Sequence, residues 1–457
     1  MRACMDTDIG QWQAVVFCGG VGYRMTDLTD HIPKCMLPIA GVPMFWYPLN
    51  FLQNNGIKDV LLIVQEKLAD EIKSTLASGA LPKLSELKIE LIPLSSSTEE
   101  WGTADILRSV SNKIKRDILV VSGDFISDFN INRMINLHRA EGSSLTCLLA
   151  ENVVNGPIPG LKIKRSRGRD LIALSSPSNQ VVFLGSEEDF DESVPLSTAL
   201  FSKFKNVFLT AKYNDCHVYI MKRWILEVLD KNRNLSSIKV DLIPYLLEQQ
   251  YCPDSDINRH LGMSRLATLA NRLSFGAPLK EDRSSLKCFG YAMKLEDASI
   301  VAHANTIGAY FEVNKAILRL LTSRFSAEFP MGIRVGPNLP ATISESYVGK
   351  GTKFVEAKAG NGTISRSDKT VIKRSVIGPN CQIGIRAKIS GSLIMKGCII
   401  GEGVQITNSI LCPECKIGDD SQITLSIIVN NQDVPVSSKI SNEVVAPEDE
   451  MEYDERV

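Results

Sequence analysis

The chain has 457 residues, of which 44% are hydrophobic and 23% are charged, and its formal net charge is −1. This length suffices for two or three domains with ordinary cores, and the balanced charge excludes a broad basic surface for nucleic acid or anionic lipid. No apolar run reaches the roughly 20 residues of a membrane span, and the polar N-terminus does not resemble a signal peptide. We therefore expect no direct contact with nucleic acid and no membrane attachment.

The cysteines indicate a reducing compartment. There are eleven of them, an odd number scattered along the chain, which does not resemble a disulfide framework. Cytosol is therefore the expected location. Only Cys412 and Cys415 lie close together, and a zinc site would need a second pair or nearby histidines, whereas the last histidine is His303. We expect buried thiols without a metal, and a redox or metal role for this pair is the less favoured alternative.

The stretch from Phe17 to Met44 is the first candidate site. It follows an apolar, strand-like run at residues 13–17. Before a helix can begin, it carries three glycines in four positions, namely Gly19, Gly20 and Gly22. Backbone without side chains can turn tightly there and present N–H groups to phosphate oxygens. Because Arg24 and Lys34 add positive charge nearby, the stretch predicts a phosphate-binding loop.

The N-terminal half alternates between two patterns. Short apolar, strand-like runs lie at residues 60–64, 89–92, 118–121 and 145–149. Helix-like stretches lie between them at residues 44–54, 67–76, 104–113 and 132–141. This alternation predicts an α/β fold in which a mostly parallel, Rossmann-like sheet is flanked by helices. In such sheets ligands bind at the carboxyl ends of the strands.

Two further candidates fall at strand ends. The run Gly-Thr-Ala at residues 102–104 opens a helix with free N–H groups, which suits the close approach of a nucleotide base or sugar. Asp124 follows the strand at residues 118–121, where a phosphoryl-transfer or nucleotidyl-transfer enzyme would hold magnesium. A role in a turn or helix cap is commoner for such an aspartate. Asp215 is a weaker candidate for a second metal ligand.

The second half of the chain has a different organisation. Residues 251–329 are irregular and polar, and we interpret them as a connector. Within residues 330–440 aliphatic residues recur in steps of six, six and five, which predicts a parallel β-helix of hexapeptide repeats. Each strand would bury one aliphatic side chain, and a small residue after it would permit the corner. We expect residues 441–457 to form an acidic, disordered tail. The repeating positions are Ile377, Ile383, Ile389, Ile394, Ile400, Ile406, Leu411, Ile417, Ile423 and Ile428.

Taken in order, the N-terminal motifs resemble those of the sugar-phosphate nucleotidylyltransferases. The family pattern of glycines, Arg, Leu-Thr and Pro-Lys is matched by the three glycines, Arg24, Leu28-Thr29 and Pro33-Lys34. The resemblance implies a nucleotidyltransferase-like domain at residues 1–250. It also implies a former nucleotide pocket lined by Gly19, Gly20, Gly22, Arg24, Lys34 and Asp124.

Three departures from this family pattern argue against catalysis. Tyr23 stands where active members usually have Ser or Thr, which would place a bulky ring in the phosphate cradle, and Asp27 stands where they usually have proline. The family's Glu-Lys-Pro element, whose lysine contacts the sugar phosphate, is expected at residues 150–200, but the chain has no Lys-Pro dipeptide. Loss of one such contact costs on the order of 3 kcal/mol in the transition state. We therefore expect no catalytic residue, no metal and no cofactor.

A nucleotidyltransferase-like domain followed by a left-handed β-helix of hexapeptide repeats occurs in two kinds of protein. One kind comprises active sugar-nucleotide pyrophosphorylases, such as mannose-1-phosphate guanylyltransferases. The other comprises the gamma and epsilon subunits of eukaryotic translation initiation factor two-B, and the whole chain is similar to the gamma kind. Epsilon subunits carry a further helical exchange domain, for which we expect no room here.

The resemblance implies a subunit of the guanine-nucleotide exchange factor that replaces GDP by GTP on translation initiation factor two. The chain would assemble and dock beside a catalytic epsilon subunit, in a hetero-decamer with two copies of each of five subunits. An active sugar-1-phosphate nucleotidylyltransferase is the alternative, and a sensor that binds a nucleotide without turnover is a third possibility. An acyltransferase role is disfavoured because no histidine follows His303.

Overall fold

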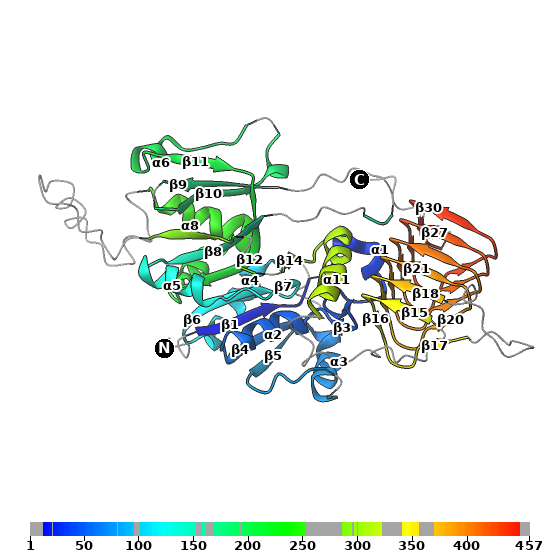
Figure 1. Cartoon of the computed structure of the whole chain (residues 1–457). Coiled ribbons are helices and arrows are strands. Elements are labelled where there is room, and N and C mark those ends of the chain that lie inside the picture. Colours follow the sequence, from blue (N-terminus) through cyan, green and yellow to red (C-terminus); the bar gives the residue numbers. More distant parts are fainter. Residues whose placement is uncertain are drawn as a thin grey trace, which may run out of the picture.

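The computed structural model describes residues 12–20, 22–79, 81–95, 101–151, 158–160, 169–176, 178–191, 193–252, 286–294, 297–298, 300–321, 341–355 and 370–447. A ten-stranded sheet with helices on both faces is followed by a three-sided β-helix (Figure 1). Both features confirm the predicted fold class. In this part of the chain, no helix is long and apolar enough to cross a membrane.

Four adjacent strands at one end of the sheet are parallel to one another, as predicted. Strand β1 (Trp12–Phe17) lies between β6 (Asp117–Ser122) and β4 (Asp59–Gln65), and β5 (Lys88–Leu94) forms the edge beyond β4. The inner strands are buried on both faces and are therefore continuous apolar runs. One face is covered by α2 (Trp46–Asn54), α3 (Glu66–Ala77) and α5 (Asn132–Ala140), and the other by α4 (Thr103–Ser109), α7 (Ile225–Lys231) and α8 (Ile243–Gln249).

The other half of the sheet contains the antiparallel pairs. Strand β12 (Tyr213–Met221) runs antiparallel to both β6 and β8 (Leu145–Glu151). Beyond β8 follow β13 (Cys288–Ala292), β10 (Gln180–Ser186), β9 (Asp170–Ser175) and, at the second edge, β11 (Val207–Thr210). Helix α6 (Thr198–Lys203) packs its Leu200 against this outer part of the sheet.

The region expected to be a connector, residues 251–329, contributes to the sheet domain itself. Strand β13 is inserted between β8 and β10, so residues 1–250 do not complete the sheet. Strand β14 (Val301–His303) pairs with β7 (Phe125–Ser127), and α11 (Ile307–Leu321) follows it. The sequence did not predict β13, because a strand of five residues is too short to show a distinctive periodicity. Only its pairing with distant strands identifies it.

The β-helix has three parallel sheets as its sides. From residue 370 onward the coils repeat after seventeen residues, whereas the first coil is longer, with Val348 beside Ile377. Ile377 lies beside Ile394, and Ile394 lies beside Leu411. All ten predicted inward positions are buried in one cluster, which confirms the repeat. The first side is formed by β15 (Ala341–Ser344), β18 (Thr370–Lys373), β21 (Lys388–Ser390), β24 (Gln405–Thr407), β27 (Gln422–Thr424) and β30 (Lys439–Ser441). The second is formed by β16 (Tyr347–Val348), β19 (Val376–Ile377), β22 (Leu393–Ile394), β25 (Ile410–Leu411), β28 (Ile427–Ile428) and β31 (Val444–Val445), and the third by β17 (Lys353–Phe354), β20 (Gln382–Ile383), β23 (Ile399–Ile400), β26 (Lys416–Ile417) and β29 (Asp433–Val434).

Among the described residues, the C-terminal end of the β-helix lies beyond the expected boundary. Strands β30 and β31 continue the coils beyond residue 440, into the region expected to be a tail. The expected start at residue 330 and the acidic residues 448–457 lie outside the described residues.

The glycines that follow the inward aliphatic residues, such as Gly384 and Gly418, do not form the corners, contrary to the expectation. The corners have positive φ and lie at other positions, which are occupied by residues with side chains, such as Arg374 (48°) and Arg386 (58°), or by other glycines, such as Gly391 (59°). A Cβ on Gly384 would lie 2.5 Å from a carbonyl oxygen of the next coil, and a Cβ on Gly418 would lie 2.6 Å from a backbone nitrogen. These glycines are needed because neighbouring coils stack closely.

An apolar cluster joins the β-helix to the sheet domain through α11 and the segment that follows the glycine loop. The short hairpin β2 (Pro38–Ile39) and β3 (Val42–Pro43) lies at its centre, with the Tyr347 ring of the first coil packed against Gly41. The Tyr310 hydroxyl on α11 donates to the Pro38 carbonyl over 2.6 Å. Other buried members are Met25, Leu28, Leu37, Trp46, Phe311, Ile317, Leu393, Ile410 and Ile427.

The stacking role of glycine predicts opposite outcomes for two nearby substitutions. Gly384→Ala should lower the free energy of unfolding by about 1–3 kcal/mol, because its Cβ meets backbone that cannot move alone. Arg386→Gly should change it by less than about 1 kcal/mol, since glycine accepts positive φ without strain. Urea unfolding of the full chain measures both. Equal destabilisation by the two variants would contradict this account.

Candidate functional site

The glycine loop follows β1 at the carboxyl edge of the sheet, as predicted. A Cβ on Gly20 would meet nothing within 4 Å, whereas a Cβ on Gly19 would lie 3.3 Å from a side chain of β5. Gly22 has a φ of +89°, and the Thr29 hydroxyl donates to its carbonyl over 3.2 Å. Both residues of the Leu-Thr pair have a structural role. Leu28 is buried in the apolar cluster that contacts the β-helix, and the Thr29 hydroxyl holds the loop at Gly22.

The side chains after the glycines differ in burial. Tyr23 is 81% exposed, so the expectation that its ring fills the phosphate cradle is wrong. Arg24 is also exposed. Asp27 is half-buried on α1 (Thr26–Thr29), and its carbonyl oxygen lies 3.9 Å from the Sγ of Cys412 in the β-helix. This helical turn therefore packs toward the second domain.

Lys34 and Asp124, both assigned to the former pocket, contact each other. Lys34 lies on the 3-10 turn η3 (Lys34–Met36), and its Nζ donates to Oδ2 of Asp124. The Ser122 hydroxyl donates to Oδ1, and the Nε2 of His303 lies 2.7 Å from the same oxygen. The Asp124 carboxylate is buried and engaged by three side chains of its own chain.

The charge of Asp124 is balanced within this cluster. Burial alone would raise the pKa of Asp124, because the carboxylate loses its hydration. The charges of His303 and Lys34, together with their hydrogen bonds, outweigh burial and hold this pKa well below its usual value. Asp124 is therefore ionised at neutral pH. A cation at this carboxylate would have to displace Lys34 or His303.

A second polar cluster adjoins the first through His217. The rings of His217 and His303 stack with their centres 4.4 Å apart and their planes inclined by 15°. His217 has a φ of +53° and lies where the register between β12 and β8 shifts. Burial and the neighbouring His303 hold the pKa of His217 well below its usual value, so its ring is neutral at pH 7.

Asp215 is buried at the centre of this second cluster. The Tyr219 hydroxyl donates to its Oδ2, and the His217 N–H donates to its Oδ1 over 3.2 Å. The Asp215 N–H donates to Asp170, which pairs with Lys239 at 2.8 Å. Burial raises the pKa of Asp215 to about 6, although the Lys239 charge and the Tyr219 hydrogen bond oppose this rise. Asp215, the weaker candidate for a metal ligand, thus accepts hydrogen bonds from groups of its own chain.

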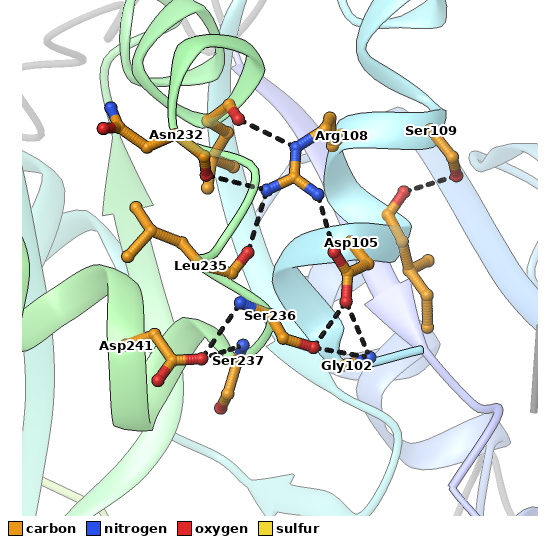
Figure 2. A network of polar contacts seen from close by, with 11 residues as sticks. Gly102, Asp105, Arg108, Ser109, Asn232, Leu235, Ser236, Ser237 and Asp241 are labelled. Carbon is orange, nitrogen blue, oxygen red and sulfur yellow. Dashed lines mark hydrogen bonds and ion pairs between the residues drawn. The ribbon is translucent and has the colours of Figure 1, made fainter. Parts of the chain in front are cut away.

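The N-terminus of α4 is closed by another part of the chain, as Figure 2 shows. The Ala104 N–H donates to the Ser236 carbonyl over 2.8 Å. The Gly102 N–H lies 3.2 Å from both Asp105 Oδ2 and the Ser236 hydroxyl. A Cβ on Gly102 would lie 2.6 Å from the Ser236 carbonyl carbon. The prediction of free N–H groups at residues 102–104 is therefore wrong: the small residue admits this neighbouring backbone.

Arg108 fixes the same segment from its other end (Figure 2). Its guanidinium lies 2.6 Å from Asp105 Oδ1. It also donates, over 2.8–3.1 Å, to the carbonyls of Leu229, Asn232 and Leu235. These carbonyls lie in or just beyond the last turn of α7, where a positive charge is favourable. Sequence reasoning missed Arg108, because nothing in the sequence distinguishes it from an ordinary solvent-exposed arginine on a helix.

Sequence reasoning also missed His217 and His303. Each belongs to a strand far along the chain from the glycine loop, and only the fold brings them to Asp124. The one available signal was that histidine is scarce, with five in the chain. Among the described residues, no group of three or more His, Cys, Asp or Glu side chains is placed to hold a metal ion.

The cysteines have the burial that the sequence predicted. Cys412 and Cys415 are free thiols buried in the β-helix. The Sγ of Cys415 lies 3.0 Å from the Val429 carbonyl oxygen of the next coil. Cys415 thus occupies a small, inward position of a coil, whereas Cys412 lies in the apolar cluster between the β-helix and the sheet domain, and both thiols have packing roles.

Comparison with known protein families agrees with this architecture. A family model described as nucleotidyl transferase matches residues 13–155. A second, described as GlmU-like, C-terminal hexapeptide, matches residues 339–424 and 386–455. The two matches fall on the sheet domain and on the left-handed β-helix.

Similar proteins include subunits of one translation factor. The eIF2B subunit gamma of Caenorhabditis elegans is 38% identical over 312 residues, which cover 68% of this chain and 69% of the relative. The gamma subunit of Dictyostelium discoideum is 27% identical over 394 residues, covering 79% and 85%. The eIF2B subunit epsilon of Schizosaccharomyces pombe is 22% identical over 237 residues, covering 50% and 34%. The chain belongs to the family of eIF2B gamma subunits.

Proposed function

We propose that this chain is a subunit of the guanine-nucleotide exchange factor that replaces GDP by GTP on translation initiation factor two. The observation that carries the proposal is the 38% identity with the gamma subunit of Caenorhabditis elegans across 68% of the chain. In this proposal the chain acts in the cytosol, beside an epsilon subunit that performs the exchange. Its own contribution is assembly and docking.

The proposed assembly is a hetero-decamer with two copies of each of five subunits. The similarity to an epsilon subunit over half of the chain supports a partner of related fold. The formal net charge of −1 supports contacts with proteins rather than with nucleic acid. Interfaces of this kind stabilise each subunit by mass action, so the isolated chain would be less stable than the complex.

The polar contacts at the former pocket support a chain that is not an enzyme by itself. A Cβ on Gly22 would lie 3.4 Å from the Cβ of Lys34, and Asp124 already neutralises the charge of this lysine. The N-terminus of α4 is occupied by Ser236. The open backbone at Gly20 and the exposed Arg24 remain available, and with Gly19 and Gly22 they are the remnant of a nucleotide site. Positioning of the reacting groups, on which phosphoryl transfer depends, would need Lys34 and Asp124 to separate.

The proposed assembly predicts what the chain brings with it from cells. A tagged chain expressed in its own cells should recover an epsilon subunit, three further exchange-factor subunits and translation initiation factor two. Quantitative mass spectrometry of the purified complex should give equal amounts of the five subunits. Recovery of the chain alone would contradict the proposed function.

The proposal also predicts that the chain has no nucleotidyltransferase activity. With magnesium, GTP or UTP and a sugar 1-phosphate, the purified chain and the complex should release no pyrophosphate above background. A coupled pyrophosphate assay measures this, with an active pyrophosphorylase as positive control. Turnover that Arg24→Ala or Asp124→Ala abolishes, and that the remote Arg374→Ala retains, would establish the enzymatic alternative instead.

The second polar cluster predicts a pH dependence of folding. The pKa of Asp215 rises from 3.8 to about 6 in the folded chain, so the folded state binds the extra proton between these values. Stability should therefore increase by about 1 kcal/mol as pH falls from 7.5 to 5, through this group alone. Asp215→Asn should remove that increment, whereas the exposed Asp433→Asn should keep it. Urea unfolding at both pH values measures the difference, and identical pH profiles for all three chains would refute it.

A further inference from the structure

The two edges of the ten-stranded sheet differ in how they are protected. Strand β5 carries the exposed residues Lys88, Glu90 and Pro93. Charged side chains and proline on an edge strand discourage pairing with another chain. Strand β11 at the opposite edge consists of Val207, Phe208, Leu209 and Thr210 and carries neither protection. The sequence thus blocks one edge and leaves the other open.

Large apolar side chains are exposed at this open edge. Phe208 is 62% exposed, Leu209 is 44% exposed, and Phe201 on the adjacent helix α6 is 51% exposed. Figure 1 shows α6 beside β11 at the outer end of the sheet. Together these three side chains expose about 300 Å² of apolar surface. Because successive side chains of a strand point to opposite faces, Phe208 and Leu209 present this surface on the two sides of the edge.

The backbone of β11 adds hydrogen-bonding groups to these exposed apolar side chains. The Ser176 N–H donates to the Asn206 carbonyl over 2.8 Å, and Phe208 lies opposite Leu174. In an antiparallel pair, backbone groups alternate between the partner strand and the outer side. Asn206 and Phe208 therefore direct their N–H and C=O groups to β9, whereas Val207 and Leu209 direct theirs outward. Within the part of the chain that the structure describes, no strand pairs with these outward groups.

We propose that an extended strand of a partner chain adds to the sheet at β11, where its side chains pack against Phe208 on one face of the sheet and against Leu209 on the other. Main-chain pairing at an exposed edge is a known mode of recognition, in which alternate side chains give specificity. The inference rests on the proposed function and deepens it: the partner is the epsilon-type subunit, and β11 is where it is held.

The size of the exposed surface distinguishes two possible partners at β11, a second copy of this chain and a subunit of a larger assembly. A stable interface buries roughly 800 Å² on each partner, and a four-residue strand with about 300 Å² of apolar surface supplies less than half of this. A second copy of this chain, paired through this edge alone, would therefore dissociate. A subunit that is held at further points of a larger assembly can use the edge, because its other contacts add to this one.

Substitution of Phe208 tests the side-chain part of the proposal. The tagged full chain is expressed together with the other exchange-factor subunits, and the epsilon subunit recovered with it is quantified. Phe208→Asp should reduce this recovery at least about tenfold, and Phe208→Leu should retain most of it. Val436→Asp is the matched control, because Val436 is 63% exposed on the β-helix, and it should recover as much as the wild type.

Leu209→Pro tests the backbone part. Proline removes one N–H that faces outward, and leaves the hydrogen bonds to β9 intact. It should reduce recovery of the epsilon subunit more than Leu209→Ala, while both chains keep the wild-type thermal midpoint within about 3 °C. Hydrogen exchange of the wild type provides a measurement without substitution: the amides of Val207 and Leu209 should exchange rapidly in the isolated chain and at least about 100-fold more slowly in the complex.

The outcomes separate the failure of this inference from that of the proposed function. If the wild type recovers the epsilon subunit and all β11 variants recover it equally, β11 is not the contact and the proposed function stands. Protection of the Val207 and Leu209 amides already in the isolated chain would show that the chain covers its own edge, and would also overturn the inference. If the wild type recovers no epsilon subunit, both the inference and the proposed function fail.

Discussion

The apolar cluster between the glycine loop, helix α11 and the β-helix is the constraint on which the rest of the structure depends. The hairpin after the loop turns through Ala40 and Gly41, both at positive φ, and Gly41 leaves room for the Tyr347 ring of the first coil. Asn314 on α11 accepts the Ala40 N–H over 2.9 Å. The segment that carries Lys34 is therefore fixed from behind by the second domain. These contacts with the second domain help to set the position of the Lys34 side chain.

Electrostatics inside the former pocket follow from that fixed position. Lys34 meets Asp124, and His303 reaches the same carboxylate from β14, so the local charges are satisfied without a ligand. Removing one partner from such a buried group typically costs about 3–5 kcal/mol, because the other charge is left uncompensated. The same cluster continues through His217 to Asp215, where a bulge and a positive φ interrupt β12. A family whose fold serves nucleotide chemistry elsewhere thus uses these polar groups here to hold strands and loop together, in keeping with the proposed assembly role.

Particular residues show where sequence reasoning succeeded and failed. The inward aliphatic positions, such as Ile394, were predictable because burial of one side chain per strand imposes a period that a single chain displays. The role of Gly384 was misjudged, since corner geometry and coil spacing both favour a small residue at that site, and only the stacked neighbour distinguishes them. The run 102–104 was misjudged for a related reason: a glycine before a helix admits either a ligand or another backbone, and here Ser236 occupies the space.

The sequence by itself determined the fold class, the repeat and part of the cluster at the carboxyl edge of the sheet, namely Lys34 and Asp124. It did so because periodicity and glycine spacing are local properties of the chain. Only the tertiary structure decided that Lys34 and Asp124 pair with each other, that His303 joins them, and that Tyr23 is exposed. It also decided that β13 completes the sheet and that β11 ends it without protection. These facts depend on which distant segments meet, and the free energy of such contacts is set by burial and mutual charge rather than by any local pattern.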